Sequence, residues 1–215
     1  MVDATKKRGK AASRRAATTR PKGQPWCPYM YLDAGPGRGE WVRGVLRRRY
    51  NGHDNDIVDF VRSKLHPIDP PKPGERWRPT AARVEVLLPP GGIPDFLLDP
   101  QRLVEFYADH LLEWQTGLAC VVKLTTRSSS LNEGWERARE YARAAFCAGR
   151  KQRGLPVILA QHAPFLAGAD GVAPHVHAIA LARRVLPGGS FGGLDYEVTS
   201  DEGLIPLYEE FKATA

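Results

Sequence analysis

The sequence predicts an α+β fold with a mainly antiparallel central sheet that carries its helices on one face. Four short apolar runs rich in Val, Ile and Leu have the length and composition of buried strands: residues 83–88, 118–124, 155–160 and 178–182. Segments with helical spacing of apolar residues separate the first three runs. The resulting order, β-α-β-α-β-β with short connections, packs as a sheet layered with helices.

Two of the predicted helices begin at residues that favour helix starts. Asp99 precedes Pro100, and Asp at the N-cap followed by Pro at the first helical position is a common start. Ser130 and Glu133 have the spacing of a capping box. Apolar residues at helical spacing predict further helices at residues 40–50, at 57–65 and from 200 onward.

The chain is expected to have three parts. Residues 1–22 form a basic arm, residues 23–80 hold N-terminal helices and a Pro-rich linker, and residues 81–215 form the α+β core. The linker is placed at residues 66–80, which carry five prolines.

The positive charge of the chain is concentrated in the N-terminal arm. The net charge is +7, and residues 1–22 hold eight Lys and Arg against Asp3 alone, so the remainder is balanced. A basic arm without aromatic residues has the composition of a disordered segment and attracts nucleic-acid phosphates without sequence preference. The predicted nucleic-acid contacts are Lys6, Lys7, Arg8, Lys10, Arg14, Arg15, Arg43, Arg47, Arg48, Arg49, Arg183 and Arg184.

Composition also indicates the cellular location expected for the chain. No apolar run approaches the roughly 20 residues of a membrane helix, so no membrane segment is expected. Cys27, Cys120 and Cys147 are odd in number and widely spaced, which favours reduced thiols and a cytoplasmic location.

Three histidines fall near the ends of the last two predicted strands. His162 ends one apolar run, and His175 and His177 begin the next after a Gly- and Pro-containing loop. Side chains alternate along a strand, so His175 and His177 point to the same face. If the loop reverses the chain, His162 joins them. Three imidazoles on one face predict a divalent-metal site with coordination positions left for a substrate.

These features resemble those of the MobA/MobL relaxases, the plasmid-mobilisation branch of the HUH endonucleases. The resemblance spans about half of the chain and rests on four features: a strand ending in Leu88-Pro89 before a helix, a strand ending at His162, a Pro-His-x-His strand at 174–177 that runs into Arg183, and a Gly-Ser-Phe-Gly turn at 189–192. It implies the ferredoxin-like arrangement of HUH proteins. It also implies a role in conjugation, with DNA and accessory mobilisation proteins as partners.

The resemblance further implies metal-dependent nicking and joining of single-stranded DNA. In that family three histidines hold Mg²⁺ or Mn²⁺ and a tyrosine hydroxyl attacks the phosphodiester, remaining attached to the 5′ end. Imidazole is a softer ligand than Mg²⁺ prefers, so Mn²⁺ is the easier ion to rationalise.

Two departures from the family pattern keep alternatives open. The family's tyrosine motif is absent, so Tyr50 is the first candidate nucleophile, with Tyr29 and Tyr31 as alternatives. Ala173 stands where the family has Asn, which predicts weaker support for the neighbouring histidine. A relaxase-like protein that binds DNA without cutting it is therefore a second interpretation, and a small-molecule metallohydrolase is a third.

Overall fold

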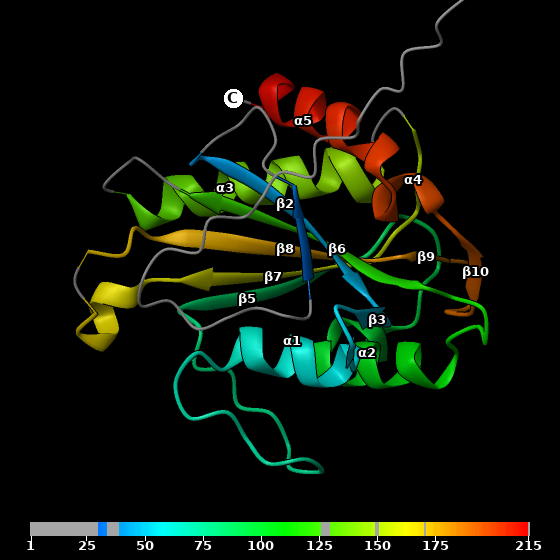
Figure 1. Ribbon diagram of the computed structural model, residues 1–215, viewed down its shortest axis with the longest axis horizontal. Coiled ribbons are helices and arrows are strands. Elements are labelled where there is room, and N and C mark those ends of the chain that lie inside the picture. The colour runs from blue at the N-terminus through cyan, green and yellow to red at the C-terminus, as the bar shows by residue number, and fades with distance from the viewer. Residues whose placement is uncertain (1–29, 34–38, 126–129, 149–150, 170, 215) are drawn as a thin grey trace, which may run out of the picture.

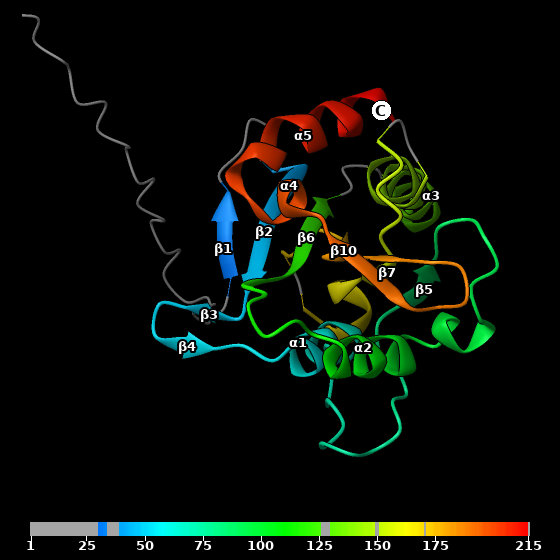
Figure 2. The same ribbon diagram turned by 90° about the vertical axis from the view of Figure 1, so that its right-hand side faces the viewer.

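The computed structural model describes residues 30–33, 39–125, 130–148, 151–169 and 171–214. At its centre lies a six-stranded sheet in which every neighbouring pair is antiparallel (Figures 1 and 2). The strands, in spatial order, are β1 (Met30–Asp33), β2 (Trp41–Arg47), β6 (Gly117–Thr125), β8 (His175–Leu181), β7 (Val157–His162) and β5 (Arg83–Leu87). The α+β class and the antiparallel sheet are confirmed.

The helices cover both faces of the sheet, which corrects the prediction of a single covered face (Figure 2). One face carries α1 (Ile57–Leu65) and α2 (Pro100–Asp109), and the other carries α3 (Leu131–Ala142) and α5 (Leu204–Ala213). The physical reason lies in the strands, because β7 and β8 are apolar in consecutive positions rather than in alternate ones. Strands of that kind bury side chains on both sides.

The two faces hold two separate hydrophobic clusters. On β8, Val176 and Ala178 pack in the cluster that contains α3 and α5, whereas Ile179 and Leu181 pack in the cluster under α1 and α2. This alternation places His175 and His177 on the α1/α2 face.

The N-terminal region belongs to the same sheet as the rest of the chain. Residues 41–47, within the helix predicted at 40–50, form β2, whose residues pair in register with β6. The central sheet therefore includes strands from both sides of the boundary expected at residue 81, since β1 and β2 pair into it beside β6. The Pro-rich segment packs against the rest of the structure, because Trp77 is buried and the amides of Thr80 and Ala81 both donate to the carbonyl of Leu65.

The predicted helix starts are confirmed. The Asp99 side chain accepts from the amide of Arg102 at the start of α2, and the Ser130 side chain accepts from the amide of Glu133 at the start of α3. A π-helical turn at Arg143–Cys147 extends α3. No described helix has the length and apolar character that crossing a membrane requires.

Shorter elements complete the structure. They are the hairpin β3 (Arg49–Tyr50) and β4 (His53–Asp54), the hairpin β9 (Arg183–Val185) and β10 (Phe191–Leu194), the helix α4 (Tyr196–Thr199), and 3-10 turns at Asp95–Leu98, Pro164–Ala167 and Asp201–Gly203.

Candidate metal site

The three histidines meet where β7 ends and β8 begins. The two strands are antiparallel neighbours, and His162 pairs directly with His175 while Ala160 pairs with His177. The loop at residues 163–174 reverses the chain between them, as the sequence predicted. Directly paired residues project from the same face of a sheet, so the register alone brings the three rings together.

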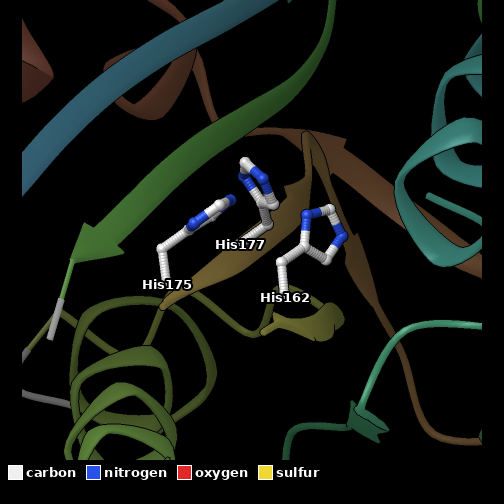
Figure 3. A group of neighbouring side chains, drawn as sticks. All are labelled: His162, His175 and His177. Atoms are coloured by element: carbon white, nitrogen blue, oxygen red, sulfur yellow. The ribbon is translucent and has the colours of Figure 1, made fainter. Parts of the chain in front are cut away.

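The three imidazole rings are turned toward one another (Figure 3). Ring centroids lie 5.1 Å apart for His162 and His175, 4.8 Å for His162 and His177, and 4.9 Å for His175 and His177. One ring nitrogen from each residue lies within 4.8 Å of the other two. The cluster therefore offers three nitrogen ligands on a rigid pair of neighbouring strands.

Backbone carbonyls fix which nitrogen of two rings faces the cluster. Nε2 of His162 lies 2.7 Å from the carbonyl oxygen of Lys64, and Nδ1 of His175 lies 3.0 Å from that of Ala173. A carbonyl only accepts, so these ring nitrogens carry the protons and the opposite nitrogens, Nδ1 of His162 and Nε2 of His175, keep their lone pairs. Ala173 thus supports His175 through its backbone even though the side chain of Asn is missing.

His177 is the least satisfied member of the cluster. Its Nδ1 is buried, and within the described part of the chain it has no hydrogen-bond partner. A buried polar atom without a partner is destabilising unless something else binds there. A divalent cation held by the three rings would engage one nitrogen of His177, so the donor set fits a metal ion.

Burial keeps the three imidazoles neutral. It lowers the pKa of His162, lowers the pKa of His175 to about 4, and lowers that of His177 well below its ordinary value. Neutral imidazole is the form that binds a metal, so at neutral pH the rings need not lose protons before coordination.

Two lysines lie beside the cluster, and sequence analysis did not identify either of them. Lys123 on β6 pairs directly with His177. Lys64 lies in the last turn of α1, and its backbone carbonyl is the one that accepts from the His162 ring. Both positive charges further lower the pKa of the three histidines. The overlooked signal was a lone charged residue within the apolar run that ends at Leu124.

The structure does not place Tyr50 at the histidines. Tyr50 lies in the β3–β4 hairpin, two residues beyond Arg48, whose amide donates to the carbonyl of Thr116. Thr116 immediately precedes β6, and His175 pairs with Thr125 at the other end of that strand. At about 3.4 Å per residue, Thr116 and Thr125 are roughly 30 Å apart along β6, so Tyr50 lies toward the end of that strand opposite to His175.

The other tyrosine candidates are placed only in part. Tyr31 lies on the edge strand β1, where it pairs with Val45, and β2 and β6 separate β1 from β8. Tyr29 lies outside the described residues.

The remaining tyrosines lie elsewhere in the described structure. Tyr107 bonds to Leu118 and Ala182 at the far end of the sheet, Tyr141 packs on the α3 side, Tyr196 stacks on Trp114, and Tyr208 contacts Trp41.

Two of the predicted DNA-binding arginines are structural and need correction. Arg43 is buried at 0% exposure and donates to the carbonyls of Val198 and Ser200. Arg183 is buried and donates to the carbonyls of Phe191, Gly192 and, closely, His110. Both guanidinium groups satisfy carbonyls of the protein, so they are not available to a phosphate.

The other predicted DNA contacts have different placements. Arg48 donates to the carbonyl of Glu113, Arg47 is partly buried, and Arg49 and Arg184 are exposed. The arm residues lie outside the described structure: Lys6, Lys7, Arg8, Lys10, Arg14 and Arg15.

Comparison with known proteins shows a similar fold and leaves the family open. No family model matches the chain, and no curated protein matches its sequence. A solved structure described as "Molecular Basis of Vancomycin Resistance Transfer in Staphylococcus aureus" is similar to it, with a TM-score of 0.50, 17% identity, and coverage of 63% of this chain and 68% of that one. The likeness concerns the fold alone.

Proposed function

We propose that the protein binds a divalent metal ion at His162, His175 and His177 and uses it to nick and rejoin single-stranded DNA, as a relaxase of the MobA/MobL type does. The observation that carries this proposal is the convergence of three neutral imidazoles, two of them oriented by backbone carbonyls. Mn²⁺ is the preferred ion because three nitrogen ligands suit it better than Mg²⁺.

The residues of the site have distinct roles in this proposal. The three histidines would hold the ion, and a divalent ion held there would supply positive charge beside a phosphate oxygen. The carbonyls of Lys64 and Ala173 hold two rings in the tautomer that presents a lone pair. In this proposal the three neutral imidazoles direct their lone pairs to the ion and are assigned no proton transfer.

The nucleophile in this proposal is a tyrosine whose hydroxyl oxygen bonds to phosphorus as the bond from phosphorus to the 3′ oxygen breaks. The products are a phosphotyrosine at the 5′ end and a 3′ hydroxyl, so the proton that the tyrosine loses is balanced by the one that the 3′ oxygen gains. Tyr50 lies toward the opposite end of β6 from His175. The register places Tyr31 opposite Val45, and Val45 opposite Cys120 of the α3/α5 cluster, so Tyr31 holds a position on the other face and Tyr29 is the remaining candidate. The basic arm at residues 1–22 supplies sequence-independent contacts to DNA phosphates.

Covalent capture tests the proposal without knowledge of the DNA sequence. The protein is incubated with Mn²⁺ and a randomised pool of single-stranded DNA, and adducts that survive denaturation are recovered and sequenced. We expect adducts with the wild-type protein and none with His175→Ala, while the matched control His110→Ala forms them normally because His110 contacts Phe106 and Phe191 instead. Equal adduct formation by His175→Ala would refute the assignment.

A second function is favoured by the position of Tyr50. If neither Tyr29 nor Tyr31 reaches the metal site, the protein binds DNA and metal without cutting. In that case no adduct forms with any DNA, although the protein still binds Mn²⁺ and single-stranded DNA. Deleting residues 1–22 should then lower the dependence of DNA affinity on salt, since counterion release follows the number of phosphate contacts.

A further inference from the structure

Lys123 occupies an unusual place in the sheet. It is the one charged residue of β6, and it is partly buried. Its direct partner on β8 is His177, so their Cα atoms are about 5 Å apart and both side chains project to the α1/α2 face. Lys123 therefore points to the same face as the ring whose Nδ1 has no partner.

Two positively charged side chains, Lys64 and Lys123, lie near the neutral histidine cluster. Burial is the main cause that lowers the pKa of the three histidines, and the charges of Lys64 and Lys123 lower it further. Among the described residues, the group that could hold a metal consists of histidines alone, without a carboxylate. A divalent ion would add two more positive charges to a site that already repels it.

The two lysines differ in how they are held. The ammonium of Lys64 lies over the Phe60 ring, 5.5 Å from its centroid, and its backbone carbonyl is already used by His162. Among the described residues, no aromatic ring lies under the ammonium of Lys123 and no carboxylate forms an ion pair with it. Of the two lysines, Lys123 is therefore the one whose ammonium is better placed to bind an anion.

We propose that Lys123 binds a non-bridging oxygen of the phosphodiester that the three-histidine site engages. The inference rests on the proposed function and adds to it a specific protein contact to the reacting phosphate. Its consequence is that metal and phosphate assist each other, because the anion offsets the repulsion between Lys123 and the ion. Such coupling is reciprocal: DNA must tighten metal binding by the same factor as metal tightens DNA binding.

Metal affinity in the absence of DNA gives the sharpest test. Lys123→Gln removes one positive charge beside the site, so we expect Mn²⁺, measured by calorimetry or electron paramagnetic resonance, to bind roughly threefold more tightly or better. Lys212→Gln is the matched control, since Lys212 pairs with Glu209 on α5, on the opposite face. An unchanged Mn²⁺ affinity in Lys123→Gln would overturn the proposal.

DNA affinity must move in the opposite direction. A short single-stranded thymidine oligonucleotide should bind Lys123→Gln about tenfold more weakly in the presence of Mn²⁺, with a salt slope smaller by about one phosphate contact. Lys123→Arg should retain most of the affinity because it keeps the charge. An equal loss in Lys212→Gln would show that net charge alone is responsible and would also overturn the proposal.

The test separates this inference from the proposed function. If wild-type protein bound no Mn²⁺, the metal-dependent function would fail, while weaker oligonucleotide binding by metal-free Lys123→Gln than by Lys212→Gln would still support Lys123 as a phosphate contact. If Mn²⁺ bound to the histidines but no covalent adduct formed, the nicking proposal alone would fail.

Discussion

Two buried polar clusters lie at opposite ends of strand β8, and they differ in charge and in how their polar atoms are paired. At its start lie His162, His175 and His177. Just past its end, the carbonyl of Ala182 accepts from the amide of Asp195, whose carboxylate receives Arg153. One cluster is neutral and leaves a ring nitrogen without a partner, and the other consists of matched charges.

The Arg153 cluster is closed by the chain itself. Nη1 of Arg153 lies 3.1 Å from both oxygens of Asp195, and Nη2 lies 3.1 Å from Glu197, which also pairs with Lys151. Arg153 and Asp195 are 5% and 7% exposed. The difference teaches that burial of polar groups does not by itself indicate function: the Arg153 cluster pairs its charges, whereas the histidine cluster brings three possible ligand nitrogens together.

The largest expected effect is on the closed cluster. Asp195→Ala leaves the buried guanidinium of Arg153 with Glu197 alone and removes the cap at the start of α4. We expect a loss of about 3–5 kcal/mol in the free energy of unfolding, measured by denaturant titration. Mn²⁺ affinity should stay unchanged, and an altered Mn²⁺ affinity would mean that the two clusters are coupled through β8.

A matched substitution in the histidine cluster should behave differently. His177→Leu replaces an unsatisfied ring with an apolar side chain, so the stability of the metal-free protein should change little. What disappears is stabilisation by metal, which amounts to about 2.7 kcal/mol at an Mn²⁺ concentration one hundred times Kd. Thermal unfolding with and without Mn²⁺ measures both quantities, and a persisting Mn²⁺-dependent rise in Tm would contradict the site.

Acid should affect the two clusters in separate ranges of pH. Burial holds the pKa of His175 at about 4, against an ordinary 6.5, so below pH 6.5 the unfolded chain binds more protons than the folded one. Stability of the metal-free protein should therefore fall as pH drops from 6.5 toward 4, by up to about 1.4 kcal/mol per pH unit for this histidine. Denaturant titrations across that range check the slope, and His175→Leu should flatten it.

The Arg153 cluster should respond only at lower pH. Burial opposes ionisation of Glu197, but hydrogen bonds from Arg153 and Lys151 outweigh it and hold the pKa of Glu197 below its ordinary value of 4.5. Its contribution is present above pH 4.5 and is lost as pH falls through the lowered value. Glu197→Gln should therefore change the pH dependence of the free energy of unfolding only below pH 4.5, as denaturant titrations can measure. A change in that dependence near pH 6 would contradict the separation.

Sequence alone predicted the histidine cluster because it depends on short-range geometry. Two residues separated by one share a strand face, and a reversal between two apolar runs brings the third into register. The helix predicted at 40–50 was wrong because Trp41 and Val45 satisfy helical spacing, yet Trp41, Arg43 and Val45 also alternate as a strand does. Pairing with β6, a contact far along the chain, decides between the two.

Two other features required the tertiary structure. Helices on both faces were foreshadowed by unbroken apolar residues in β7 and β8, a pattern that alternate burial does not produce. The place of Lys123 beside His177 depends on β6 lying next to β8, and strand order between distant segments is not written in local periodicity. The closed Arg153–Asp195 pair likewise joins residues 42 positions apart.

The smallest effect is expected from a substitution at Tyr50, which lies toward the end of the sheet that also carries the Arg153 cluster. Tyr50→Phe removes one hydroxyl toward the opposite end of β6 from His175, so Mn²⁺ affinity and covalent adduct formation should match those of the wild-type protein. Tyr29→Phe and Tyr31→Phe are the companion variants, and peptide mapping of the adduct identifies the residue that carries DNA. A DNA-linked peptide containing Tyr50 would require the β3–β4 hairpin to cross the length of the sheet, and would overturn the distinction between an open, reactive end and a closed, structural one.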